Sequence, residues 1–289
     1  MSRAIDHGRL ENNLYKHVSF LSEDIGERHL WRDDTLARAE NYIASQFELL
    51  GYHPFKQKYT AYQKPVANVI AEKSGQRKDL IVIGAHYDTV PGSPGADDNA
   101  SAVAGLLEVA RLMRDSECRY RYAFAAFANE ESPSFGSDYM GSMQYARYLH
   151  DQREKVKFMI ALEMIGYFNE SPSQSYPLRL MRSFYPKSSN FLAVIGDFAS
   201  HRYVRALCRR IRKENLIPVR SLIAPQQLGG INRSDHSAFW QYGYKAVMIT
   251  DTSQYRNKNY HRETDTIDTL NFSALADVVV SLHRTLINL

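Results

Sequence analysis

The stretch "LIVIGAHYDTVPGSPGADDNAS", residues 80–101, joins an apolar run to a turn dense in charge. Its first six residues are apolar or glycine, which is typical of a strand buried on both faces of a parallel sheet. The turn that follows carries a histidine and three aspartates, namely His86, Asp88, Asp97 and Asp98. Because binding and catalytic residues gather on loops held by a rigid scaffold, this turn indicates a functional site.

The rest of the chain alternates between apolar strand-like segments and helical periods. Strands are predicted at residues 67–73, 80–86, 120–129, 157–165, 191–196 and 246–251. Helices are predicted at about 8–22, 34–50, 100–114, 141–152 and 202–215, and from about 272 onward. This alternation predicts a three-layer α/β/α sandwich with a central mixed, mainly parallel sheet. Residues 1–289 are predicted to form a single domain, in which the Ser-, Pro-, Tyr- and Phe-rich segment 167–190 is a lid-like loop or insertion.

Composition excludes several classes of protein. With 44% hydrophobic and 24% charged residues, the 289-residue chain is an ordinary globular one. The net charge of +4 is too mild for a nucleic-acid track, and the basic segment 202–215 has the spacing of a surface helix. No apolar run approaches membrane-spanning length, so no membrane partner is expected. The N-terminus lacks an apolar leader, which predicts a cytoplasmic protein, although a trimmed exported form would look the same. Nothing indicates an oligomeric state.

Charged side chains recur where the predicted strands end. They are His86 and Asp88, then Glu130 and Glu131, then Glu163, and finally His261 in the loop after 246–251. In an open α/β sheet, ligands bind outside the carboxyl ends of the strands, so these side chains are expected to meet at one edge. Carboxylates gathered there without partners would raise one another's pKa values. A pair of divalent cations would remove that repulsion.

The number of charges fits such a pair. Two divalent cations are neutralised by the carboxylates of Asp98, Glu131 and Glu163 together with one bridging hydroxide. The imidazoles of His86 and His261 add nitrogen donors, and this mixture of nitrogen and oxygen ligands suits Zn²⁺. The sequence therefore predicts two zinc ions, with other divalent metals as alternatives.

Two further acids are left for catalysis and orientation. Glu130 has no metal in this scheme and would stand beside the bridging water, where a general base is needed. Asp88, two residues after His86, is predicted to accept the second ring N–H of that histidine and so to orient it.

Taken together and in order, several motifs resemble one known family. They are "HYD" (86–88), "GADDNAS" (95–101), "NEE" (129–131), "LEM" (162–164), "RSDHSAFW" (233–240) and "YHRETDT" (260–266). This set resembles the co-catalytic di-zinc aminopeptidases of the bacterial leucyl type, a family that includes glutaminyl cyclases. The resemblance spans roughly residues 86 to 265 and implies the zinc-exopeptidase fold and a peptide substrate with a free N-terminus.

The resemblance also implies a role for each matching residue. Asp98 matches the ligand that bridges both metals, and the peptide bond from Asp98 to Asn99 matches one that is cis in the family. His86 matches a ligand of one zinc, and Glu131 and His261 match ligands of the other. Glu130 matches the general base. Glu163 stands where the best-known aminopeptidases have aspartate, which leaves the substrate preference open.

Other interpretations remain open from the sequence. The same motifs occur in glutaminyl cyclases, which need one effective zinc, and a non-catalytic metal-binding domain is a third reading. Two intact ligand sets favour hydrolysis. Asp235 is either an ordinary helix cap or a support for the metal site. The aromatic residues of the predicted lid either line a side-chain pocket or pack in the core: Tyr167, Phe168, Phe184, Tyr185 and Phe191.

Overall fold

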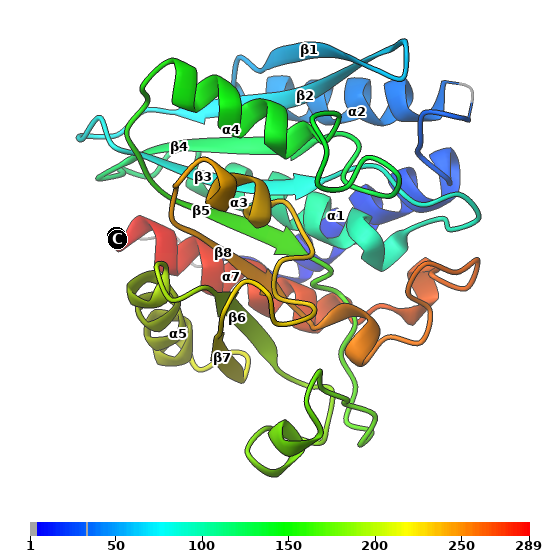
Figure 1. Ribbon diagram of the computed structural model, residues 1–289, viewed down its shortest axis with the longest axis vertical. Helices are drawn as coiled ribbons and strands as arrows, with labels where there is room; N and C mark the ends of the chain where they lie inside the picture. The colour runs from blue at the N-terminus through cyan, green and yellow to red at the C-terminus, as the bar shows by residue number, and fades with distance from the viewer. Residues whose placement is uncertain (1–4, 33) are drawn as a thin grey trace.

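The computed structural model describes residues 5–32 and 34–289. Its centre is an eight-stranded sheet in the order β1-β2-β4-β3-β5-β8-β6-β7 (Figure 1). The strands are β1 (Phe55–Ala61), β2 (Lys64–Lys73), β3 (Leu80–His86), β4 (Arg121–Phe127), β5 (Val156–Glu163), β6 (Leu192–Gly196), β7 (Val219–Ile223) and β8 (Ala246–Thr250). The pairs β3·β4, β3·β5, β5·β8 and β6·β7 are parallel, and the pairs β1·β2, β2·β4 and β6·β8 are antiparallel. The predicted mixed, mainly parallel sheet is confirmed.

Helices cover both faces of this sheet. One face carries α1 (His7–Ser19), α2 (Thr35–Leu49), α3 (Ala102–Met113), α5 (His201–Glu214) and α7 (Phe272–Ile287). The other face carries α4 (Gly141–Asp151) and α6 (His236–Gln241), which lie in front of the sheet in Figure 1. The predicted three layers are confirmed.

The apolar run that ends in His86 shows why this fold forms. Alternate residues of a strand point to opposite faces. Ile81 and Ile83 pack in the cluster beneath α1, α3 and α7, whereas Leu80 and Val82 pack beneath α4 and α6. A strand buried on both faces must be apolar at every position, so β3 shows no polar alternation. Its residue Gly84 leaves room for the ring of Phe127, which a Cβ there would strike.

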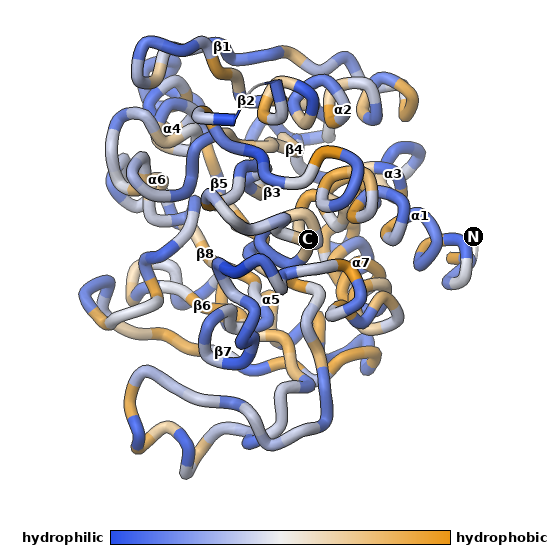
Figure 2. Tube along the Cα trace, turned by 90° about the vertical axis from the view of Figure 1, so that its right-hand side faces the viewer, coloured by the Kyte–Doolittle hydropathy of each residue, from blue (hydrophilic) through white to orange (hydrophobic). Residues whose placement is uncertain are grey.

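The α4/α6 face is only partly covered by helices. Over β8, β6 and β7 it is covered instead by the segment 166–191, which leaves the sheet after β5 and contains a short 3-10 turn at Arg179–Ser183. In Figures 1 and 2 this segment extends beyond β7, away from the main body. The predicted insertion at 167–190 falls within this segment, and its role as a lid stays a prediction.

Two strands and the end of the first helix depart most from the sequence prediction. Strands β1 and β7 were not predicted, because both lie at edges of the sheet and carry polar residues instead of an apolar run. The first helix ends at Ser19 rather than at 22, and the chain continues as a π-helical turn over Phe20–Ile25. Within the described residues, no helix is both long and apolar enough to cross a membrane.

Candidate metal centre and active site

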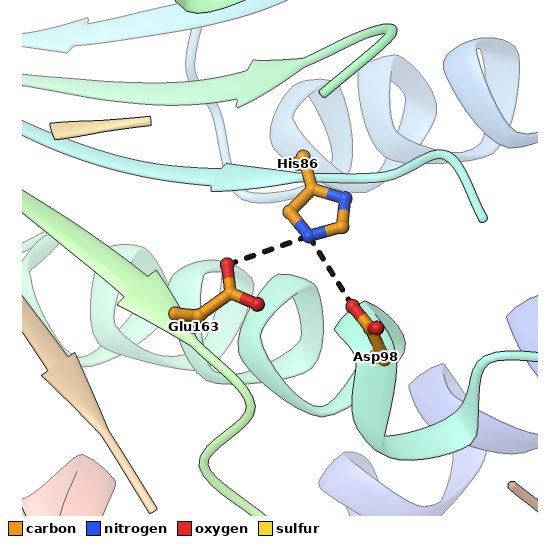
Figure 3. Close-up of side chains that lie close together, drawn as sticks. All are labelled: His86, Asp98 and Glu163. Carbon is orange, nitrogen blue, oxygen red and sulfur yellow. Dashed lines mark ion pairs between the residues drawn. The ribbon is translucent and has the colours of Figure 1, made fainter. Parts of the chain in front are cut away.

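The carboxyl ends of β3 and β5 bring three predicted ligands together. His86 is the last residue of β3, Glu163 is the last residue of β5, and Asp98 lies in the turn Ala96–Ser101 that leads into α3. Figure 3 shows the three side chains pointing toward one another. Nε2 of His86 lies 3.4 Å from Oδ1 of Asp98 and 3.4 Å from Oε2 of Glu163.

A second group forms around the other oxygen of Asp98. Nε2 of His261 lies 3.2 Å from Oδ2 of Asp98 and 3.1 Å from Oε1 of Glu131. The two oxygens of Asp98 therefore face two histidines, one at the end of β3 and one in the segment after β8, which is the arrangement a bridging carboxylate requires. In each group the candidate ligand atoms lie within 4.8 Å of one another, and so do those of His86, Glu130 and Glu131.

Two buried atoms at the centre lack hydrogen bonds. Nε2 of His86 and Oδ1 of Asp98 are shielded from water and have no hydrogen-bond partner among the residues that the structure describes, although they face each other at 3.4 Å. Buried polar atoms are almost always satisfied, so this pair calls for a partner of another kind. A cation held by imidazole nitrogen and carboxylate oxygens would satisfy both, and such donors suit zinc.

The charges of the site are strongly coupled. Burial raises the pKa of Glu130 well above its ordinary value, and the neighbouring carboxylates of Glu131 and Glu163 raise it further, against the influence of His86. Burial and the carboxylate of Asp98 raise the pKa of Glu131 to about 7. Burial opposes ionisation of Asp98 too, but the neighbouring imidazoles of His261 and His86 outweigh it and lower the pKa of Asp98. Without metal, the site therefore retains protons that cations would displace.

The stability of the metal-free protein is expected to fall as the pH rises. Burial raises the pKa of Glu131 from 4.5 to about 7, so the folded state holds a proton that the unfolded state loses between those values. Burial opposes the charged form of His261, but Asp98 and Glu131 raise its pKa from 6.5 to about 10, and that stabilisation is lost as the pH rises through 10. Both shifts make the folded state bind more protons, so stability declines with pH.

Zinc should reverse this trend because ligands bind it in their deprotonated forms. The urea midpoints of chelator-treated and zinc-loaded protein can be measured near pH 5.5 and near pH 8.5. The difference between the two midpoints should be larger at the higher pH. A gap that is the same at both pH values would contradict this account of the site.

Asp88 contacts His86 through two of its oxygens, and its predicted role in orienting that histidine stays a prediction. Its backbone carbonyl oxygen lies nearer to Nδ1 of His86, at 3.2 Å, than its carboxylate does, at 3.5 Å. The carboxylate instead accepts hydrogen bonds from the backbone amides of Glu130 and Glu131, at 2.9 and 3.0 Å. The carboxylate lies farther from His86 because it is held by these two amide donors. The same two bonds position the turn that carries both glutamates.

Asp265 does the same for the turn that carries Asp98, and the sequence analysis missed it. Its two carboxylate oxygens accept hydrogen bonds from the amides of Asp97 and Asp98, each at 3.0 Å. Asn99 connects this turn to the end of β5 by donating to the carbonyl of Leu162 and accepting from the amide of Met164. The peptide bond between Asp98 and Asn99 is cis, as the family resemblance implied.

The segment 233–240 reaches the site through Ser234, and Asp235 fits neither of its two interpretations, a helix cap or a support for the metal site. Ser234 donates a hydrogen bond to Oε2 of Glu163 at 2.8 Å. Asp235 is fully buried, does not cap α6 with its side chain, and has no hydrogen-bond partner on either carboxylate oxygen among the described residues. The contact to a candidate ligand therefore comes from Ser234, which from sequence was expected only as a possible helix cap.

Arg28, also missed, holds the loop between β3 and Asp98 from inside the protein. It is fully buried, and its guanidinium donates five hydrogen bonds of 2.7–2.9 Å to backbone carbonyls, those of Leu21, Gly26, Tyr87, Pro94 and Gly95. Burial lowers the pKa of Arg28 to about 10, which still leaves it charged at neutral pH. Gly95 has a positive φ of 59°, and a Cβ there would strike the carbonyl of Asp98.

Replacing Arg28 with methionine is expected to lower the free energy of unfolding by about 3 kcal/mol or more, because five buried carbonyls lose a charged donor. Urea unfolding of the zinc-loaded protein measures this. The matched control is Arg32→Met, which changes an arginine whose side chain is 52% exposed, and an effect within about 0.5 kcal/mol is expected there. If the two variants were equally stable, Arg28 would not be the anchor of this loop.

A pocket adjoins Glu163. Its wall includes Tyr185 and Phe191 of the predicted lid, and Tyr260 lines it beside the metal centre. The other predicted aromatics lie elsewhere: Phe184 is 78% exposed, and Phe168 is buried against the guanidinium of Arg256. Arg256 also donates hydrogen bonds to the carbonyls of residues 167 and 191, at 3.3 and 2.8 Å. It therefore connects both ends of the segment 166–191 to the loop after β8.

An α/β sandwich whose strand ends gather carboxylates and imidazoles around one shared aspartate has the architecture of a metallopeptidase. The chain belongs to peptidase family M28, whose family model matches residues 68–284.

Two relatives in sequence show the range of similarity. The chain is 39% identical to the uncharacterized protein YfbL of Escherichia coli, over 95% of this chain and 87% of that protein. It is 25% identical to leucine aminopeptidase 1 of Ajellomyces capsulatus, over 94% of this chain and 68% of that one.

Solved structures share the fold. The zinc aminopeptidase BSAP of Bacillus subtilis superimposes with a TM-score of 0.77 at 16% identity, over 95% of this chain and 94% of that chain. A glutaminyl cyclase of Bacteroides thetaiotaomicron superimposes with a TM-score of 0.73 at 19% identity, over 96% and 98% of the two chains.

Proposed function

We propose that this protein is a di-zinc aminopeptidase that removes the N-terminal residue from peptides. The observation that carries the proposal is the sharing of Asp98 between two ligand groups, one with His86 and Glu163 and the other with Glu131 and His261. One zinc would be held by each group. Membership of a peptidase family and the names of the relatives support the same conclusion.

Zinc bound there would polarise the scissile carbonyl and lower the pKa of a bound water. Glu130 lies close to both groups that share Asp98: it clusters with His86 of one and Glu131 of the other, and its Oε2 is 3.9 Å from Nε2 of His86. Its carboxylate is the general base in this proposal: it takes a proton from the attacking water and returns it to the leaving amine. The amides of Glu130 and Glu131 are held by Asp88, which keeps the two carboxylates in different positions.

The substrate would enter with its free amine toward Glu163 and its first side chain in the adjoining pocket. Ser234 donates a hydrogen bond to Oε2 of Glu163, the same oxygen that faces His86, and so fixes the carboxylate at the metal centre. Residues 167–190 act in this proposal as a lid over the pocket, since several of their side chains line it.

Glutaminyl cyclase is the second candidate because a cyclase shares the fold over nearly the whole chain. The two functions give products of different mass. Hydrolysis adds water and releases the first residue, whereas cyclisation of an N-terminal glutamine releases ammonia and keeps the chain length.

Mass spectrometry of a peptide library incubated with the zinc-loaded protein tests the proposal. The library should contain free and acetylated N-termini and peptides that begin with glutamine. We expect removal of the first residue from free N-termini alone. Release of ammonia from glutaminyl peptides without loss of residues would show a cyclase, and unchanged peptides would refute both candidates.

A further inference from the structure

The pocket beside Glu163 is a slot that runs across the sheet. Glu163 pairs with Thr250, Thr250 with Ala193, and Ala193 with Arg220, so these residues form one row over β5, β8, β6 and β7. Neighbouring strands lie about 4.8 Å apart, which separates the Cα atoms of Glu163 and Arg220 by about 14 Å. Paired residues share a face of the sheet. The slot therefore has the metal centre at one end and Arg220 at the other.

The floor of the slot is apolar. It is formed by side chains from β8, β6 and β7, the three strands that lie beyond β5. These side chains are Ala193, Ile195, Leu222 and Met248. The helices α4 and α6 pack over the other half of this face, so the walls come from loops, at residues 174–185, 230–233 and 252–260. Such a floor suits the methylene groups of a long side chain.

The walls carry positive charge. Two of the segments that contribute them, residues 171–196 and 216–234, contain no aspartate or glutamate. Their charged residues are all cations: Arg179, Arg182, Lys187, Arg220 and Arg233. Glu163 is the sole acid among the described residues that line the slot.

The two cations that line the slot itself are without ion pairs. Within the described residues, neither Arg220 nor Arg233 has a carboxylate within 4.0 Å, and both are exposed. A cleft walled by charge of one sign attracts ligands of the opposite sign.

We propose that the slot selects substrates whose N-terminal residue is acidic, with Arg220 as the specificity-determining residue that binds the side-chain carboxylate. This proposal rests on the proposed aminopeptidase function. A guanidinium forms paired hydrogen bonds with a carboxylate, which a hydrophobic pocket cannot offer. Glutamate is preferred over aspartate because the slot is long and its floor accepts the additional methylene.

The test compares kcat/KM for glutamyl, aspartyl, leucyl and lysyl p-nitroanilides with the zinc-loaded, full-length protein. The glutamyl substrate should be cleaved most efficiently. Arg220→Met should lower the ratio of glutamyl to leucyl cleavage at least about tenfold, mainly through KM, because a charge-assisted bond is lost. Arg220→Lys should restore part of the ratio, and Arg220→Glu should shift the preference toward the lysyl substrate.

The matched control is Arg205→Met, an exposed arginine on α5, which packs on the opposite face of the sheet; it should leave the ratio unchanged. Calorimetric binding of free glutamate and free leucine separates this proposal from the proposed function. If the protein cleaves leucyl substrates best and Arg220→Met leaves the ratio unchanged, the slot proposal is overturned while aminopeptidase activity stands. If no substrate is cleaved, the aminopeptidase function fails, and a glutamate affinity that Arg220→Met does not weaken overturns the slot proposal as well.

Discussion

Replacing Asp98 with alanine is expected to abolish tight binding of both metal ions and to lower kcat/KM at least about 10³-fold. One oxygen of Asp98 faces His86 and the other faces His261, so a single substitution removes a ligand from both groups. Metal ions supply several kcal/mol of transition-state stabilisation in such enzymes, which corresponds to a loss of this size. Metal analysis after dialysis and a peptidase assay on the same sample measure both effects.

The control for Asp98→Ala is Asp151→Ala, which changes an aspartate whose side chain is 65% exposed at the end of α4. It should keep metal and activity. Circular dichroism and a urea midpoint establish that Asp98→Ala is folded, and Asp98→Asn gives a second variant of nearly native shape. Two tightly bound zinc ions in a folded Asp98→Ala protein would disprove the bridging role.

Substitutions of the adjacent acids Glu130 and Glu131 are expected to impair the enzyme in different ways, one through kcat and the other through zinc binding. Glu130→Gln keeps the size of the side chain but cannot accept a proton from water. General base catalysis contributes about 10²–10⁴-fold, so kcat should fall by that factor while the metal content stays unchanged. Glu131→Gln should instead weaken zinc binding at the group that contains His261, and excess zinc should restore part of the activity.

This comparison is its own control, because the two residues are neighbours with the same side chain and both amides bind Asp88. Loss of metal in Glu130→Gln together with its retention in Glu131→Gln would exchange the two assignments. A fully active Glu130→Gln enzyme would rule out the proposed base.

The sequence predicted most of the candidate site because its residues directly follow apolar strands. His86 and Glu163 end β3 and β5, and an apolar run that stops at a charged residue is visible in the sequence without a structure. The three layers were predictable for the same reason, since strands buried on both faces lack polar alternation. The edge strands β1 and β7 were not predictable, because half-exposed strands resemble loops in composition.

Residues that act through long-range backbone contacts could not be found in this way. Arg28 binds carbonyls as far away as residue 95, and Asp265 binds amides near residue 98. Neither contact has a periodic signal, because it depends on how distant loops meet after folding. The slot between Glu163 and Arg220 was hidden for the same reason: its row of four residues comes from strand order and register.

Zinc titration of the metal-free protein, with peptidase activity as the readout, tests the central claim most directly. Two ligand groups that share Asp98 predict that activity toward a peptide with a free N-terminus reaches its plateau at two zinc ions per chain. A plateau at one zinc per chain, with no further change on adding the second, would contradict the account.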